Sequence, residues 1–412
     1  MGDSLAEDDV PRSCTMKRLA RDDSPTSPSL VDLLTTPDPQ SLGMVERLRR
    51  ATLVEVVYPA DRGAIGIRGS HAPLSWTETT RPTATLGDRR VFELSIPDGE
   101  TVDIKLVRGN DEWAHGRNYT LHAGDHLRLE PAFEQSRSRL LDSVVLDGSP
   151  WPLSYQVLLP PSYDEQREKR YPVLYAQDGQ ALWSSSFDPY GIWKLDVAVD
   201  QLLELAVMQE LIVVGIDTSL ARMDRLGPVR DRTYGGGQAS RHLDMITDML
   251  KPRIDRDYRT RAGREDTGLI GSSLGGLFSF FGAWNRPDVF GKAICLSSSF
   301  WWGNRAMIRA VDVAPVPAPT IYLDSGVALS PEEASQDGFH HTRSMHRALV
   351  RAGYTNGLDL HRLAFPGQVH STAAWAARVS IPLQLLFPPS PLTQVPAKSI
   401  AVGSSPVIED PT

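Results

Sequence analysis

Six apolar runs separated by helical segments constrain the fold of this chain more than any other feature. They lie between residues 140 and 388 and read YQVLLP (155–160), YPVLYAQ (171–177), LIVVGID (211–217), TGLIGSS (267–273), KAICLSSS (292–299) and TIYLDSG (320–326). Continuous apolar runs of this length are typical of strands buried on both faces of a parallel sheet. Their alternation with helical segments predicts a doubly wound, mostly parallel α/β domain over residues 140–388.

A different pattern precedes this domain. Residues 45–134 contain short β-type runs broken by Gly, Pro, Asp and Asn, namely LVEVVY (53–58), AIGIRG (64–69), RVFELSI (90–96), VDIKLVR (102–108) and LRLEP (127–131). Such spacing predicts a small all-β sandwich of the immunoglobulin-like type. Residues 1–40 and 389–412 are polar and have no sustained period, which predicts a disordered leader and a disordered tail.

Composition excludes several classes of function. The formal net charge of −8 gives no general attraction to nucleic acid or to an anionic membrane. No apolar stretch has the length of a secretory signal or of a spanning helix. The two cysteines, Cys14 and Cys295, do not make a disulfide framework. We therefore expect a cytoplasmic protein with no nucleic-acid or membrane partner, and the sequence does not indicate its oligomeric state.

The strongest local motif is Gly271-Ser272-Ser273-Leu274-Gly275, which has the form G-x-S-x-G. An apolar strand precedes it and an apolar helix, LFSFFGAW, follows it. A serine on a sharp turn between strand and helix projects its hydroxyl above the sheet, and the flanking glycines allow the close backbone approach. The context predicts a nucleophile at Ser273, in preference to a glycine-rich turn that only packs a helix against a sheet.

A serine nucleophile needs a base, which follows it in the chain order of α/β-hydrolases. Of the five later histidines, His370 lies in FPGQVHSTAAW, between a turn and an apolar helix, and is the predicted base. His361 falls in an apparent strand. The remaining three, His340, His341 and His346, are expected to be exposed, with a metal site as the weaker alternative, so no metal is predicted.

The acid that orients the histidine should lie in a loop beyond a strand. The candidates after the serine are Asp312, Asp324, Glu332, Glu333, Asp337 and Asp359. Asp337 fits best, and Asp324, closer to its strand end, is the alternative. For the oxyanion, the backbone amide of Leu274 is one predicted donor, and that of Gln180, in the loop after YPVLYAQ, is the other.

Several motifs occur together in an order that resembles a known family. They are YPVLYAQDGQALW, the GSSLGGL turn, LSSSFWW at 296–302 and the closing GQVHSTAAWAARVSIPLQLLF. The chain from about 140 to 387 resembles the enterochelin (ferric enterobactin) esterase-like group of α/β-hydrolases. The resemblance implies a catalytic Ser273, His370 and Asp337 with no cofactor. Where siderophore-specific relatives carry R-x-x-E-L, this sequence has Arg222-Met223-Asp224-Arg225-Leu226, and a double aspartate is replaced by Asp337-Gly338.

We therefore expect a serine esterase acting on a small-molecule ester, with a ferric siderophore trilactone and a role in iron transport as one candidate. Predicted substrate contacts are Trp183, Arg222, Trp301 and Trp302. An acyltransferase of the same fold is one alternative. Another is a glycan-binding protein with an idle hydrolase domain, because RGSHAPLSW (68–76) and VRGNDEWAHGRN (107–118) resemble glycan-binding sandwiches. For the sandwich itself, a structural or substrate-gating role is favoured over glycan binding.

Overall fold

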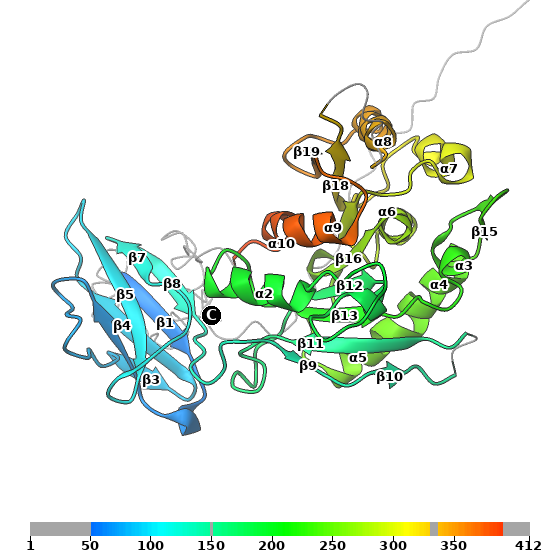
Figure 1. Cartoon of the computed structure of the whole chain (residues 1–412). Helices are drawn as coiled ribbons and strands as arrows, with labels where there is room; N and C mark the ends of the chain where they lie inside the picture. Colours follow the sequence, from blue (N-terminus) through cyan, green and yellow to red (C-terminus); the bar gives the residue numbers. More distant parts are fainter. Residues whose placement is uncertain (1–50, 149–150, 330–336, 390–412) are drawn as a thin grey trace, which may run out of the picture. The chain divides into compact units, whose positions relative to one another are not determined.

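The computed structural model describes residues 51–148, 151–329 and 337–389 (Figure 1). The predicted leader and most of the predicted tail lie outside these residues. The predicted domain boundaries stay predictions. No helix in the described ranges combines the length and the apolarity needed to cross a membrane.

The first part of the described chain is an antiparallel β-sandwich. One sheet has the order β3 (Ala84–Leu86), β4 (Arg89–Leu94), β1 (Thr52–Val57) and β8 (His126–Leu129). The other sheet has the order β2 (Ile65–Gly69), β5 (Thr101–Arg108) and β6 (Glu112–Trp113), with β7 (Tyr119–His122) also paired to β5. Side chains such as Val54, Phe92 and Ile104 alternate inward and form one buried core. The predicted sandwich is confirmed. Only the β1–β8 pair is parallel.

The second part is a nine-stranded mixed sheet. Its main path has the order β10 (Val144–Val145), β11 (Ser154–Leu159), β13 (Ile212–Ile216), β12 (Val173–Gln177), β16 (Thr267–Ser272), β17 (Lys292–Leu296), β18 (Thr320–Val327) and β19 (Leu360–Pro366). The short strand β9 (Arg139–Leu140) pairs with β11. Every pair from β13 to β19 is parallel, and β11 runs antiparallel to β13. The predicted mostly parallel α/β domain is therefore confirmed.

This sheet separates two hydrophobic cores. Along β12, Val173 and Tyr175 belong to one core, while Leu174 and Ala176 belong to the other. The alternation follows from the two-residue period of a strand, and it explains why these strands read as continuous apolar runs. The helices of the domain are α2 (Leu195–Glu204), α3 (Arg222–Leu226), α4 (Ala239–Met245), α5 (Lys251–Asp257), α6 (Leu274–Asn285), α7 (Trp302–Ala310), α8 (Phe339–Arg351), α9 (Thr372–Arg378) and α10 (Ser380–Leu386). Residues of α4 and α6 pack in the first core, and residues of α2 and α10 in the second.

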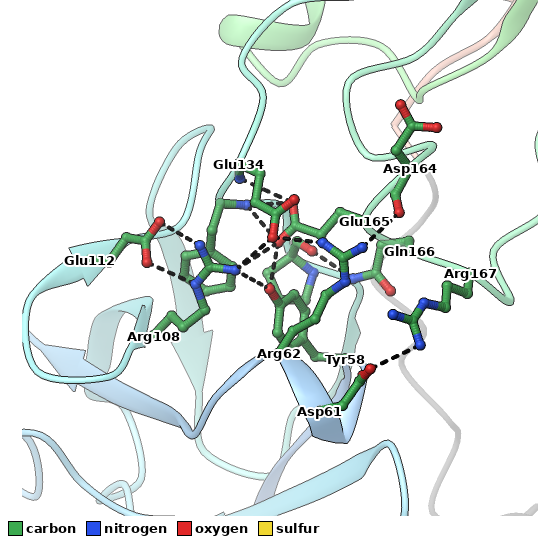
Figure 2. A network of polar contacts seen from close by, with 12 residues as sticks. Tyr58, Asp61, Arg62, Arg108, Glu112, Glu134, Asp164, Glu165, Gln166 and Arg167 are labelled. Carbon is green, nitrogen blue, oxygen red and sulfur yellow. Dashed lines mark hydrogen bonds and ion pairs between the residues drawn. The ribbon is translucent and has the colours of Figure 1, made fainter.

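A buried carboxylate, Glu165, joins distant parts of the chain (Figure 2). It lies after β11 and is 1% exposed. One of its oxygens accepts a 2.6 Å hydrogen bond from the Tyr58 hydroxyl, and its carboxylate also accepts from the backbone amides of Phe133 and Glu134 at 2.9–3.1 Å. Arg108 supplies the nearby positive charge at 3.7 Å. Burial, followed by the bond to Glu165, raises the pKa of Tyr58, so its phenol stays a donor at neutral pH.

Removal of this carboxylate should destabilise the protein. We expect Glu165→Ala to lower the free energy of unfolding by about 2–4 kcal/mol, because a buried amide, a part-buried amide and a buried phenol lose this acceptor. Urea unfolding measures the change. The matched control is Asp164→Ala, whose carboxylate pairs with Arg139 but is 50% exposed, and which should cost less than about 1 kcal/mol. Equal losses in the two variants would contradict a special role for Glu165.

Candidate active site

Ser273 stands on a strained turn between β16 and α6. Its backbone has φ 55° and ψ −119°, a conformation that costs a non-glycine residue about 1–3 kcal/mol. The turn is so tight that a Cβ at Gly271 would lie 2.4 Å from the carbonyl carbon of Gly275. Glycine is therefore required at 271. The Ser273 amide donates to the Leu296 carbonyl at 2.9 Å, which fixes the turn to the end of β17.

The structure brings the three predicted residues Ser273, His370 and Asp337 into one hydrogen-bonded row. His370 Nε2 lies 2.9 Å from Ser273 Oγ, and His370 Nδ1 lies 2.7 Å from Asp337 Oδ1. Because an ionised carboxylate can only accept, Nδ1 carries the proton and Nε2 is free to accept from the serine hydroxyl. The same hydroxyl also lies 3.3 Å from Ser299 Oγ.

Asp337 is 2% exposed, yet it is held ionised. Burial acts to raise its pKa, but hydrogen bonds from His370, from the Gly326 amide and from Ser297 outweigh burial and lower the pKa below its usual range. Ser297 Oγ donates to Oδ2 at 2.7 Å, and the Gly326 amide donates to the same oxygen. Oδ1 of Asp337 is thus bonded to the histidine, and Oδ2 accepts from Ser297 and from the Gly326 amide.

The two amides predicted to bind an oxyanion lie on adjoining segments. Leu274 is the first residue of α6, and Gln180 lies in the short 3₁₀ turn Gly179–Ala181 after β12. A Cβ at Gly275 would lie 3.1 Å from Asp178 Oδ2 and 3.2 Å from the Cβ of Gln177, so the start of α6 packs directly on this loop. The positive end of the α6 dipole is therefore at this edge of the site.

A cavity of about 710 Å³ opens beside Ser273 and His370. Its volume lies within the usual range for small-molecule sites. Three aromatic side chains line it: Tyr190, Trp193 and Trp375. The Trp375 ring stands edge-to-face against His370, with ring centroids 4.9 Å apart. The cavity therefore combines an apolar wall with the reactive groups.

Arg222, a predicted substrate contact, does line this cavity, but its charge is already matched. Its Nε and Nη2 donate to the two oxygens of Asp178 at 2.7 and 2.8 Å. Burial acts to lower the pKa of Arg222, but Asp178 and then Asp188 raise it above its usual value. Asp188 also lines the cavity. The guanidinium therefore stands near two carboxylates.

Three of the predicted substrate contacts, Trp183, Trp301 and Trp302, are not among the residues that line this cavity. Trp183 is 1% exposed and packs in the second core, where a Cβ at Gly215 would touch its ring at 2.5 Å. Trp302 is 3% exposed, and its Nε1 donates to the Val229 carbonyl at 2.7 Å. Trp301 is 38% exposed and packs against Tyr234, but it is not among the residues lining this cavity. The position of a tryptophan in a predicted loop thus does not indicate whether its side chain lines the cavity.

The other histidines lie apart from the row. His340, His341 and His346 are on α8, where the ring centroids of the first two lie 3.9 Å apart with the rings tilted by 43°, and His346 Nε2 lies 2.6 Å from Asn356 Oδ1. His361 is on β19. In the part of the chain that the structure describes, no group of three His, Cys, Asp or Glu side chains could hold a metal ion. Glu332 and Glu333 lie outside the described residues, and Cys295 is a buried free thiol.

One buried histidine that sequence reasoning did not single out supports the site from below. His242, on α4, is fully buried and its ring packs against Phe278 of α6 with centroids 4.9 Å apart. Its Nε2 donates to Gln177 Oε1 at 3.1 Å, next to the loop that carries Gln180. Burial, and then the charge of Arg225, lowers the pKa of His242 to about 3. The imidazole is therefore neutral in the folded protein.

This histidine should make the fold sensitive to acid. Because the folded pKa is depressed, the unfolded chain binds a proton below about pH 6.5 that the folded protein excludes, so stability falls by up to about 1.4 kcal/mol per pH unit between pH 6.5 and 3. We expect His242→Gln to remove this slope. Urea unfolding at pH 7.5, 6 and 5 tests it, with exposed His115→Gln as the control. The same pH dependence in both variants would sink the prediction.

The sequence matches the family described as Putative esterase over residues 148–380. The uncharacterized protein YbbA of Bacillus subtilis is 28% identical over 213 residues, which cover 49% of this chain and 79% of YbbA. The iron(III) salmochelin esterase of Escherichia coli O6:H1 is 27% identical over 190 residues, 42% of this chain and 44% of that protein. The ferric enterobactin esterase structure from Salmonella typhimurium gives a TM-score of 0.46 at 13% identity, covering 78% of this chain and 88% of that one. The chain thus spans less than half of the salmochelin esterase.

Proposed function

Because the chain belongs to the Putative esterase family, we propose that it is a serine esterase that hydrolyses a carboxylic ester through an acyl-enzyme. The observation that carries the proposal is the unbroken row of hydrogen bonds from Ser273 through His370 to Asp337, with the serine on a strained turn at the mouth of a cavity. The same three groups, so arranged, make a serine hydroxyl nucleophilic at neutral pH.

The proposed reaction has two halves. In the first, Ser273 Oγ attacks the ester carbonyl carbon while His370 Nε2 takes the hydroxyl proton, and Asp337 stabilises the imidazolium that forms. The carbonyl oxygen becomes an oxyanion that accepts from the Leu274 and Gln180 amides. The C–O bond then breaks and His370 protonates the leaving alcohol. In the second half, water attacks the acyl-enzyme by the same route and releases the acid and Ser273.

The cavity favours an aromatic ester without net negative charge. Tyr190 and the half-buried Trp375 offer ring surface to an aryl group, whereas Trp193 lines the cavity but is 3% exposed and packs in the second core. The charged side chains that line the cavity are Asp178, Asp188 and Arg222, so the carboxylates outnumber the guanidinium. A substrate carboxylate or a polyanionic complex would meet no unmatched cation among them. An uncharged acyl group avoids that electrostatic cost.

Siderophore hydrolysis is the more specific proposal that the relatives suggest, since their names include iron(III) salmochelin esterase and iron(III) enterobactin esterase. A ferric triscatecholate is strongly anionic, whereas the metal-free trilactone carries much less charge. The charge of the cavity therefore supports the metal-free form over the ferric complex. Transfer of the acyl group to an alcohol, glycan binding by the sandwich and a cytoplasmic location stay predictions.

A labelling and turnover experiment tests the proposal. The purified protein is treated with a fluorophosphonate and the labelled peptide is mapped, and turnover is measured with aryl esters and with metal-free and ferric triscatecholate esters. We expect label on Ser273 and faster turnover of uncharged esters, by about tenfold or more in kcat/KM, which corresponds to about 1.4 kcal/mol. An active protein labelled elsewhere would overturn the esterase mechanism. Label on Ser273 with preference for the ferric complex would overturn only the substrate class. Products formed with an added alcohol would identify a transferase.

A further inference from the structure

We propose that Arg378 is a positioning residue that fixes Asp337 and the His370 loop relative to one another, through a buried network that includes a second carboxylate, Asp324. This inference rests on the proposed roles of the two triad residues. Arg378 is the last residue of α9 and is 1% exposed. It does not line the cavity, so it acts through other groups and not on the substrate.

Every nitrogen of the guanidinium is used. Nε and Nη2 donate to the two oxygens of Asp324 at 3.1 and 3.0 Å. Nη1 donates to Gln368 Oε1 at 2.8 Å. Nη2 also contacts Ser297 Oγ and lies 3.4 Å from Asp337 Oδ2. A planar guanidinium with its donors in a fixed fork can hold four groups at set angles, which an ammonium cannot do.

Two of these contacts reach the proposed acid. Asp337 Oδ2 accepts hydrogen bonds from Ser297 Oγ and from the Gly326 amide, and Arg378 Nη2 lies 3.4 Å from the same oxygen. Oδ1 is bonded to His370. Ser297 is itself held, because its amide donates to Asp324 Oδ1 at 3.0 Å. The carboxylate of Asp337 therefore cannot rotate about its χ2 angle without breaking bonds at Oδ2.

The other contact reaches the histidine loop. Gln368 lies two residues before His370, and α9, which ends at Arg378, begins two residues after it. The hydrogen bond from Arg378 to Gln368 therefore connects the segment before His370 to the helix that follows it. The loop is packed closely, since a Cβ at Gly326 would lie 1.9 Å from the Gln368 carbonyl oxygen. A single side chain thus ties the histidine loop to the acid.

Arg378 also supplies the positive charge that balances two buried carboxylates. Asp324 and Asp337 are both buried, 0% and 2% exposed, and one buried cation serves both. The other titratable groups near Asp324 are the Tyr322 hydroxyl, which donates to it at 3.1 Å, and the Cys295 thiol, both neutral. Burial raises the pKa of Asp324 to about 6 even beside Arg378. Without the arginine, two buried carboxylates bridged by Ser297 would compete for a proton, and Asp337 would share it.

The test compares Arg378→Met, Arg378→Lys and the double variant Arg378→Met/Asp324→Asn. Rates are divided by the fraction of Ser273 that a fluorophosphonate titrates, so that misfolded protein does not count. For Arg378→Met we expect kcat per labelled site to fall about 10–100-fold with KM within about threefold, and the acid limb of the pH–rate profile to move to higher pH. Lysine should restore the pH limb but not the full kcat. The double variant should also restore the limb, because it leaves Asp337 as the one buried carboxylate of the pair.

Each outcome decides the proposal. An unchanged kcat per labelled site together with an unchanged pH limb in Arg378→Met would overturn it. A variant with fewer labelled sites but a normal kcat at each of them would also overturn it, because that is the result expected of an arginine that only stabilises the fold. Exposed Arg351→Met, at the end of α8, is the matched control and should behave as wild type. If Arg378→Met does not fold, kcat per labelled site and the acid limb of the pH–rate profile are compared between wild type, the lysine variant and the double variant. Failure of the proposed function would show differently, as wild-type turnover without label on Ser273.

Discussion

Replacement of Ser273 by alanine should lower kcat for an aryl ester by a factor of about 10⁴–10⁶, the loss typical of a removed serine nucleophile. The hydroxyl is the atom that the strained turn presents to His370 Nε2 at 2.9 Å, and no other hydroxyl among the described residues is hydrogen-bonded to that nitrogen. Initial rates measure turnover, and intact-protein mass spectrometry after fluorophosphonate treatment measures phosphonylation of the nucleophile.

The matched control is Ser279→Ala, the same substitution further along α6. Ser279 Oγ donates to the Gly275 carbonyl at 2.9 Å and takes no part in the row. We expect its kcat to stay within about threefold of wild type. Thermal unfolding should be similar in the Ser273 and Ser279 variants. Retention of turnover by a folded Ser273→Ala protein would contradict the proposed nucleophile.

Asp337→Asn should lower kcat by about 10³–10⁴-fold without loss of the fold. An asparagine amide can donate to His370 Nδ1, which would place the imidazole proton on Nε2 and leave no acceptor for the Ser273 hydroxyl. The measurement is kcat at saturating aryl ester, with circular dichroism as the check of folding. The effect should be smaller than that of Ser273→Ala, because the serine and the histidine of a triad each contribute more to kcat than the acid does.

The comparison with Asp324→Asn separates the two acids that the sequence left open. Asp324 has no hydrogen bond to His370, and its oxygens accept from Arg378, from Tyr322 and from the Ser297 amide. We expect its substitution to lower kcat far less than Asp337→Asn does. If the Asp324 variant loses more, the order of the two roles is reversed.

The scaffold could be predicted because its signals are local. Each buried strand is visible as an apolar run, and Gly271 and Gly275 mark a turn whose close approach excludes a side chain. The order of Ser273 and His370, each next to a strand or helix boundary, was enough to predict that the two meet. Strand ends in a parallel sheet gather at one edge, so residues that follow such strands can be expected to lie close together from their positions in the chain alone.

The walls of the cavity could not be predicted in this way. Trp183 and Trp193 lie ten residues apart in one loop and both pack in the second core, at 1% and 3% exposed, yet Trp193 also reaches the lining of the cavity and Trp183 does not. Their exposure depends on the path of the loop, which no local pattern encodes. Arg378 was missed for a related reason. It ends an ordinary helix, and its partners Asp324 and Ser297 are 54 and 81 residues away.

The placement of β16 between two cores has a consequence for how this protein could be altered. Residues of that strand, such as Leu269 and Ile270, are locked into opposite cores. Ser273 stands at its end, whereas Tyr190, Trp193 and Arg222 come from loops or from the short helix α3. The proposed nucleophile and these residues that line the cavity therefore come from separate segments of the chain. A library randomised over the loop that carries Tyr190 would explore new acyl groups while every member inherits the same nucleophile geometry.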